Sequence, residues 1–452
     1  MSADLERPWA ASDARRALPA ICFLARATSI VAAGWIVKTP DLRIKTMLAR
    51  DAATDMSHAY AIRRRLRALA NPDGGSPEIS DGYWSLIHEV DHAVDSDALV
   101  AGIYGVIKPR LRSCAEEYLR LADPLTDSLG AREVQALCVD LAAQADHVQA
   151  DISGSPWLDR LASMWPDAKS GDSQGIDGPV SGLIDRAPFA SRPASFRRGS
   201  IGAMREMPDD PLRDQKGVGL FLHNFLNEEV ATMELAGRNL YEHADMPWEF
   251  QLESAWHAAD EARHSLIIER AANRLGVSYG DYPVYLSSYE GQYQFGPCEP
   301  GSKRELLWRI LLRQTFHEGL ALDSLAFEVR KRGHAQQFDL ASLFEWLLVD
   351  EIFHAQSGLR WSRFLCEGNE ELVLNERGLA HEYFVAMVKE ARARFVIEHP
   401  EEAMAEVDQL DSISRREQLP FHRVLNITAR KAAGFTDADL EQIVGWGYVP
   451  RA

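Results

Sequence analysis

Two short motifs of the same design recur 90 residues apart in this 452-residue chain. They are Asp260-Glu261-Ala262-Arg263-His264 and Asp350-Glu351-Ile352-Phe353-His354. In each motif a glutamate and a histidine stand three positions apart, so on a helix both side chains project from one face. A carboxylate and an imidazole on one face make half of a metal site.

A further glutamate precedes each motif by almost the same number of residues. Glu229 lies 32 residues before Glu261, and Glu318 lies 33 residues before Glu351. A turn sequence lies midway in each pair: Asp245-Met246-Pro247 in the first and Gly333-His334-Ala335-Gln336 in the second. Because an antiparallel helical hairpin rises about 1.5 Å per residue, each glutamate is expected at the same height as the motif opposite.

The sequence therefore predicts a site for two metal ions inside a helical bundle. The six predicted ligands are four carboxylates and two imidazoles: Glu229, Glu261, His264, Glu318, Glu351 and His354. Their helices are otherwise rich in apolar residues, where an unpaired carboxylate is costly. Two divalent cations would balance the four negative charges.

Other acidic residues compete for the same roles. Glu234 and Asp323 each follow a chosen glutamate by five residues, which rotates them about 140° around the helix and lifts them about 7.5 Å. They are therefore not expected to share the site. Glu228 and Glu328 remain as weaker substitutes.

The ligand set resembles that of the ferritin-like di-iron carboxylate superfamily. In that superfamily helices one and three of a four-helix bundle each give a glutamate, and helices two and four each give a Glu-x-x-His. The resemblance covers roughly residues 210–365 and matches all six ligand positions in type. The tail Leu419-Pro420-Phe421, with Asn426 and Ala429–Gly434, is similar to bacterial ferritin-like proteins of uncharacterised function.

The resemblance implies an oxidoreductase: a dinuclear non-haem iron oxidase or oxygenase that activates O₂ on a small-molecule substrate. Two irons, or one manganese and one iron, fit the hard carboxylate and imidazole ligands. Glu261 and Glu351 would bridge the metals, each histidine would bind one metal, and Glu229 and Glu318 would be terminal. No flavin or nicotinamide fingerprint is present, so an external electron donor is expected.

Two other functions remain open at this stage. One is iron storage or peroxide detoxification, as in ferritins and rubrerythrins, and the other is a non-catalytic binding module with a vestigial site. Storage proteins usually are compact single bundles or carry an added rubredoxin-like site. The large extra helical regions and the absence of Cys-x-x-Cys favour the enzyme.

The chain is expected to be all-α, because no stretch shows sustained alternation of apolar and polar residues. We expect an N-terminal helical domain (1–160), a Gly/Ser/Pro-rich linker (161–210), the ferritin-like bundle (211–365) and a C-terminal helical extension (366–452). The expected helices outside the motifs are Leu18–Val37, Pro40–Leu69, Tyr83–Ala122, Ala131–Ile152, Arg213–His243 and Leu372–His399.

The N-terminal helices are predicted to form a second bundle, for which a degenerate copy of the first is one open interpretation. Asp55-Met56-Ser57-His58 has the spacing of a carboxylate–histidine pair, but the matching level on the preceding helix, near Phe23, holds no carboxylate. In the next hairpin the same level falls near Arg110 and Ala142, again without ligands. We expect this region to pack on the metal-binding bundle, or to form part of a homodimer interface or a substrate lid.

Two features near the motifs are expected to support the site. The crossover Tyr279–Ser302 is dense in tyrosine and glycine, and either covers the bundle edge or controls substrate access. His257 lies one turn before Glu261, and His317 is rotated about 100° from Glu318. We predict that both histidines are either structural or support a ligand through a hydrogen bond, without being among the six.

Composition limits the partners and the location. The formal net charge of −18 disfavours nucleic acid or an anionic membrane as a partner. The longest apolar stretch, Ala17–Val37, is interrupted by Arg26, so we expect neither a signal peptide nor a membrane span. The five cysteines include no Cys-x-x-Cys, which predicts reduced thiols and a cytoplasmic protein.

Overall fold

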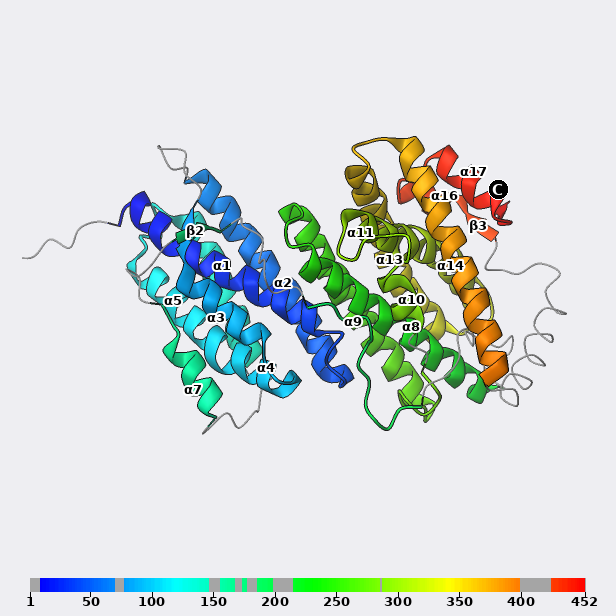
Figure 1. The fold of residues 1–452 in the computed structure, drawn as a ribbon, viewed down its shortest axis with the longest axis horizontal. Helices are drawn as coiled ribbons and strands as arrows, with labels where there is room; N and C mark the ends of the chain where they lie inside the picture. Colours follow the sequence, from blue (N-terminus) through cyan, green and yellow to red (C-terminus); the bar gives the residue numbers. More distant parts are fainter. Residues whose placement is uncertain are drawn as a thin grey trace, which may run out of the picture. The chain divides into compact units, whose positions relative to one another are not determined.

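The computed structural model describes residues 9–69, 77–145, 155–166, 173–176, 185–197, 214–284, 287–398 and 424–451. Their regular secondary structure is almost entirely helical, which confirms the all-α prediction (Figure 1). The described strands are three residues long. β1 (Glu78–Ser80) pairs antiparallel with β2 (Ser173–Gly175), and β3 (Val424–Asn426) pairs parallel with β4 (Val449–Arg451).

The chain divides into two compact units. The N-terminal unit comprises residues 1–187 and 236–259, and the C-terminal unit comprises residues 188–235 and 260–452. The division crosses one helical hairpin, so the tip of that hairpin groups with the N-terminal helices, whereas the sequence analysis placed all of 211–365 in one bundle. Within the N-terminal unit, a Cβ on Gly237 would lie 2.5 Å from the carbonyl oxygen of Ala33, so glycine permits a close helix contact there.

The N-terminal unit contains two antiparallel helical hairpins and several shorter helices. Its elements are α1 (Ala11–Trp35), α2 (Leu42–Ala68), α3 (Asp81–Asp91), α4 (Ser96–Gly102), the π-helix η1 (Ile103–Ile107), α5 (Lys108–Leu121), α6 (Ser128–Ala145) and α7 (Pro156–Ser163). α1 packs against α2, and α5 packs against α6. The predicted hairpins are thus present, although their helices begin and end a few residues from the expected positions.

The prediction of one continuous helix at Tyr83–Ala122 is wrong. The stretch Tyr83–Ala122 is divided into α3, α4, η1 and α5, because the chain breaks at residues 92–95 and Asp95 starts a new helix. The side chain of Asp95 accepts a hydrogen bond from the backbone N–H of Ala98 at 2.8 Å, which caps α4. Residues 146–152 of the predicted helix Ala131–Ile152 lie outside the described part of the chain.

Helix α1 is a core helix. Among the described residues it is the one helix that is long and apolar enough to cross a membrane, but 89% of its most apolar window is buried inside the protein. Arg26, in the middle of this helix, is fully buried and donates to Gln251 Oε1 and to the carbonyl of Ala244, both at 2.9 Å. A buried arginine with two protein acceptors is typical of a protein interior.

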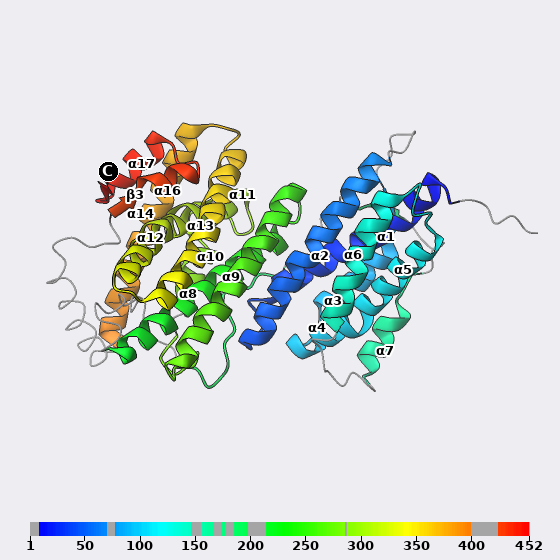
Figure 2. The ribbon, with the colours of Figure 1, turned by 180° about the vertical axis from the view of Figure 1, so that it is seen from behind.

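The C-terminal unit is built on two long hairpins. The first is α8 (Gln215–Glu242) with α9 (Trp248–Arg274), whose tip belongs to the other unit, and the second is α12 (Glu318–His334) with α13 (Phe338–Leu365). Both predicted turns are confirmed by these bounds. The remaining elements are α10 (Ser287–Tyr293), α11 (Lys303–Ile310), the π-helix η2 (Leu311–His317), α14 (Glu370–Glu398), α16 (Ile427–Ala432) and α17 (Asp437–Gly445). Figure 2 shows α8, α9 and α13 side by side within this unit.

The C-terminal extension covers the second hairpin. Leu322 of α12 and Leu359 of α13 form a buried apolar cluster with Leu425, Phe435 and Ile443 of the C-terminal extension. The expected helix Leu372–His399 is present as α14, which begins at Glu370. Leu419-Pro420-Phe421, part of the similarity noted above, lies outside the described residues.

The segment predicted as a linker, 161–210, is described only in part. Residues 185–197 are irregular, with neither helix nor strand. β2 lies in the same segment and pairs with β1, so this part of the chain lies against the N-terminal unit.

Candidate metal centre

The two hairpins bring all six predicted ligands into a buried cluster. Glu229 comes from α8, Glu261 and His264 from α9, Glu318 from the first position of α12, and Glu351 and His354 from α13. Their exposed fractions lie between 0% and 5%. Carboxylates at this depth require opposite charge or hydrogen bonds, which a divalent cation supplies well.

The first part of the cluster surrounds His264. Ligand atoms of Glu229, Glu261, His264 and Glu351 all lie within 4.8 Å of one another. Nδ1 of His264 is 3.2 Å from Glu229 Oε2, 3.4 Å from Glu261 Oε2 and 3.9 Å from Glu351 Oε1. One imidazole nitrogen therefore faces three carboxylates.

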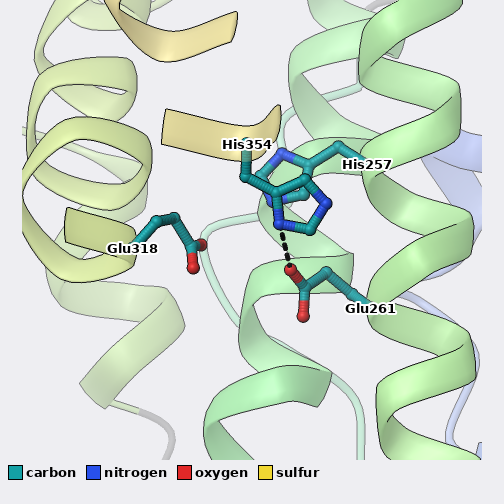
Figure 3. A group of neighbouring side chains, drawn as sticks. All are labelled: His257, Glu261, Glu318 and His354. Carbon is teal, nitrogen blue, oxygen red and sulfur yellow. Dashed lines mark ion pairs between the residues drawn. The ribbon is translucent and has the colours of Figure 1, made fainter. Parts of the chain in front are cut away.

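The second part surrounds His354. Ligand atoms of Glu261, Glu318 and His354 again lie within 4.8 Å of one another, and Figure 3 shows these side chains converging. Nδ1 of His354 is 3.2 Å from Glu261 Oε1 and 3.3 Å from Glu351 Oε2. Glu261 and Glu351 therefore each lie between the two imidazoles, where bridging carboxylates would lie.

His257 belongs to the same neighbourhood through its helix. It stands one turn before Glu261 on α9, is 4% exposed, and is drawn together with Glu261 in Figure 3. A structural or supporting role was expected for it from the sequence. Its ring nitrogen lies within 4.8 Å of ligand atoms of Glu261, so it is placed to act as a ligand or to hydrogen-bond one.

The sequence analysis assigned no role to Asp260 and Asp350, which orient the two histidines. Nε2 of His264 lies 3.0 Å from Asp350 Oδ2, and Nε2 of His354 lies 3.4 Å from Asp260 Oδ2. Each aspartate thus holds the histidine of the opposite motif. An N–H donated from Nε2 leaves Nδ1 directed at the carboxylates as a ligand atom. The signal was present in the sequence, since an aspartate precedes the glutamate in both motifs.

Arg263 joins these two aspartates. Its guanidinium contacts Asp260 Oδ1 at 3.1 Å and also forms an ion pair with Asp350. Burial opposes ionisation of Asp260, but the contact with His354 and then Arg263 keeps its pKa below the ordinary value. The pKa of Asp350 is lowered in the same way by His264 and Arg263. Both aspartates are therefore anionic acceptors for the imidazole N–H groups.

Two carboxyl groups within the cluster have pKa values that are raised, unlike those of Asp260 and Asp350. Burial and the neighbouring Glu261 raise the pKa of Glu229 well above its ordinary value, and burial and Glu318 do the same to the pKa of Glu351. Burial lowers the pKa of His264, but Glu261 and the other carboxylates outweigh it and raise that pKa well above the ordinary value. The metal-free cluster therefore retains protons, and a cation that binds there would replace them.

A π-helix immediately precedes Glu318, and the sequence analysis did not predict it. η2 spans Leu311–His317, so Glu318 is the first residue after the widened turn. Such turns occur often at functional sites. His317, at its end, packs against Phe316 and Phe384, each with ring centroids 5.1 Å away. Burial and Arg313 lower the pKa of His317 to about 3, so its ring is neutral.

The two carboxylates that were excluded by helix geometry are held elsewhere by buried arginines. Arg192 pairs with Glu234 at 2.5 Å, and Arg430 pairs with Asp323 at 2.7 Å. In both hairpins, then, the acidic residue five positions after the ligand glutamate is neutralised by an arginine from outside the hairpin.

The weaker substitutes also have arginine neighbours. Arg313 lies 3.6 Å from Glu228, and Arg332 lies 2.7 Å from Glu328. Neither Glu228 nor Glu328 is among the residues whose ligand atoms gather around the two histidines.

The aromatic crossover lies against α8. The hydroxyl of Tyr279 donates to Asn227 Oδ1 at 3.1 Å and accepts from Arg192 Nε at 3.1 Å. Asn227 is two residues before Glu229. Residues 285–286 of the crossover lie outside the described part of the chain. The described start of the crossover thus covers the helix that carries the first ligand.

Comparison with known proteins gives one match. A family model described as "Protein of unknown function (DUF455)" matches residues 158–441. No curated protein and no solved structure matches the chain. The matched range contains both hairpins and all six predicted ligands.

Proposed function

The chain belongs to the DUF455 family, whose description assigns no function, and we propose from the site itself that the protein is a dinuclear metal oxidoreductase. It would use two irons, or one manganese and one iron, to activate O₂ on a small-molecule substrate. We propose further that residues 211–365 form a ferritin-like bundle. Reduction would come from an external electron donor.

One observation carries this proposal: four carboxylates and two imidazoles converge in one buried cluster, and both histidines are fixed by aspartates. Metal ligands supported in this way are typical of built metal sites. The set is rich in oxygen and has no thiolate, which favours iron or manganese over a structural zinc. Bound iron would supply one-electron redox chemistry with O₂.

The chain's own residues have separable roles. Glu261 and Glu351 lie between the two imidazoles and would hold both metals together, with Glu229 and Glu318 at either side. Asp260 and Asp350 hold the proton on Nε2 of the histidines. Leu226 and Leu347 are buried apolar residues one turn before Glu229 and Glu351 on their helices, and they would limit the access of water to the cluster.

The proposal includes the cellular location of the protein and the kinds of partner it binds. All five cysteines are free thiols, as in proteins of a reducing compartment, and we propose a cytoplasmic location. The net charge of −18 supports a partner that is neither nucleic acid nor an anionic membrane. A homodimer is compatible with this proposal and would be tested by the mass of the protein in solution.

Metal stoichiometry tests the proposal directly. Protein loaded with Fe(II) without oxygen and then desalted should retain about two irons per chain. Glu261→Ala and His354→Ala should retain less, because each removes a ligand from the cluster. One iron per chain, or none, with all six residues intact would contradict a dinuclear site.

Oxygen exposure separates the enzyme from the storage alternative. The loaded protein should consume O₂ without continued uptake of added iron. Steady growth of a ferric mineral would instead identify a storage protein. If the fully loaded protein neither consumed O₂ nor formed a mineral, the non-catalytic binding module would be the remaining function.

A further inference from the structure

A cavity of about 770 Å³ lies at one end of the two hairpins in the C-terminal unit. Its walls come from the start of α8, the end of α9, and the turn and first residues of α13. Small-molecule sites commonly have volumes of about 300–1,000 Å³. The cavity is therefore large enough for a small organic ligand.

The cavity lies in line with the metal cluster on three helices. Leu222 precedes Glu229 by seven residues, and Ala271 follows His264 by seven. Seven residues make almost two helical turns, so each wall residue lies on its ligand's face, about 10 Å along the axis. Since α8 and α9 are antiparallel, both lead from the ligands toward the same end of the unit.

The third helix gives the same direction. Leu340 precedes Glu351 by eleven residues, or about three turns, and so shares its face. Between the wall and the cluster stand Phe225, one turn from Leu222 on α8, and Leu347, two turns from Leu340 on α13, both apolar. An apolar interior thus continues from the cavity toward the ligands.

The mouth of the cavity carries two arginines. Arg270 and Arg274 both line it, stand one turn apart on α9 and are exposed. Neither has an ion-pair partner among the residues that the structure describes. Asp339 is the acidic residue of the lining, so the lining carries a net positive charge on a chain whose total charge is −18.

We propose that this cavity binds an apolar chain that ends in an acidic group, a carboxylate or a phosphate. Arg270 and Arg274 bind the acidic group, and Leu222, Ile267 and Leu343 contact the chain. His264, Ile267, Arg270 and Arg274 follow one another along α9, so the acidic group lies farther from the cluster than the chain does. That such a molecule is the substrate rests on the proposed function, whereas its binding does not.

The test uses full-length, metal-free protein and three probes of equal chain length: dodecanoate, dodecyl phosphate and dodecanol. Binding is measured by isothermal titration calorimetry below the micelle concentration. One or both acids should bind at least ten times more tightly than dodecanol, and the better acid identifies the preferred headgroup. Equal binding of dodecanol, or no binding of either acid, would overturn the proposal.

Variants then locate the site. Arg270→Gln with Arg274→Gln should weaken binding of the acid at least tenfold, and Arg270→Lys with Arg274→Lys should restore most of it. Ala271→Trp should block the cavity from a partly exposed position. Unchanged binding in folded Gln and Trp variants, checked by thermal unfolding, would overturn the assignment to this cavity.

Glu261→Ala separates this inference from the proposed function. This variant should lose metal and still bind the acid. If the wild-type protein bound the acid but held no iron, the proposed oxidoreductase function would be contradicted and the cavity assignment would be kept. If it held two irons per chain but bound no acid, the cavity assignment would be contradicted and the proposed function would be kept.

Discussion

The N-terminal and C-terminal units solve the same problem of buried charge in different ways. Each has a π-helix that ends directly before a charged residue: η1 before Lys108 and η2 before Glu318. In the C-terminal unit that residue joins three other carboxylates and two histidines. In the N-terminal unit it is a cation.

Lys108 is the centre of a buried polar network. Its ammonium lies 3.0 Å from Asp55 Oδ2 and donates to Gln144 Oε1 at 2.7 Å, while Gln144 Nε2 donates to Asp55 Oδ1 at 3.1 Å. Tyr104, within the π-helix, donates to Asp51 at 2.5 Å. The buried aspartates of this bundle are thus balanced by the side chain of Lys108, which is a permanent part of the protein.

The histidine of the Asp55-x-x-His58 pair does not join this network through its ring. His58 Nε2 contacts Asp140 at 2.7 Å instead. The groups of histidines and carboxylates suited to a metal include no residue of the described parts of α1–α7. In the N-terminal unit a fixed lysine balances the core carboxylate, whereas for the C-terminal unit we propose a removable metal ion. Only the proposed second arrangement would make redox chemistry available.

Loss of Lys108 should give the largest effect. Lys108→Met leaves buried Asp55 without its cation, which should lower the free energy of unfolding of the N-terminal unit by about 3–5 kcal/mol at neutral pH. Burial raises the pKa of Asp55, so the loss should shrink in acid, where Asp55 takes up a proton. Urea denaturation at two pH values measures both.

Lys38→Met is the matched control. Lys38 forms an ion pair with the exposed Asp185 at 2.7 Å, and an exposed pair contributes only about 0–1 kcal/mol. Equal losses for the two lysines would mean that Lys108 does not balance a buried charge, and the comparison of the two units would fail.

Metal binding should stabilise one unit and not the other. Mn(II), or Fe(II) without oxygen, at 100 to 1,000 times its dissociation constant adds about 2.7–4.1 kcal/mol to a unit that binds it only when folded. Calorimetric unfolding should show the shift in the C-terminal transition, and Glu261→Ala should abolish it. A shift of the N-terminal transition would mean that metal binds in the N-terminal unit, which would contradict the role of Lys108 as its balancing cation.

The pH dependence of the metal-free protein follows from the raised carboxyl pKa values. Glu229 and Glu351 have folded pKa values well above the ordinary 4.5, so their contribution to stability is complete below that value. It is lost as pH rises through the folded pKa values, because the carboxylates then ionise beside one another. In chelator, the C-terminal transition should therefore fall in temperature as pH rises from about 5 to 8.

Metal should reverse this trend, because binding releases the retained protons and tightens as pH rises. Proton release is measured by calorimetric titration in two buffers of different ionisation enthalpy. A binding enthalpy that is independent of the buffer would contradict the retained protons.

The sequence predicted the hairpins and the six converging side chains because both follow from local rules. Helical spacing fixes which residues share a face, and the turns at residues 245–247 and 333–336 fix the heights of the glutamates. Lys108 and Gln144 lie only two residues from the levels that the sequence analysis searched, Arg110 and Ala142, but a search for ligands passes over a lysine.

Other features depend on tertiary contacts that carry no periodic signal. The π-helices interrupt the regular helical period, and the Arg192–Glu234 and Arg430–Asp323 pairs join segments 42 and 107 residues apart. The break between α3 and α4 is marked in the sequence only by the capping residue Asp95. The crossed contacts of Asp260 and Asp350 require the two hairpins to be already placed side by side.

The smallest effect on metal binding is expected at the two arginine-held carboxylates. Glu229→Gln or Glu318→Gln removes a charge from the cluster, so Fe(II) retained per chain should fall clearly. Glu234→Gln should leave metal retention near wild type, because its carboxylate contacts Arg192 at 2.5 Å and not the cluster. It should still lower the free energy of unfolding by about 1–3 kcal/mol, since the buried Arg192 loses a charged acceptor. Metal analysis and urea denaturation of the same preparations separate the two effects.

If Glu234→Gln lost iron while Glu229→Gln kept it, the ligand on α8 would be Glu234, five positions farther along. The equivalence of the two hairpins would then rest on the residues that we assign to the arginine pairs, and the helix register of the site would be wrong.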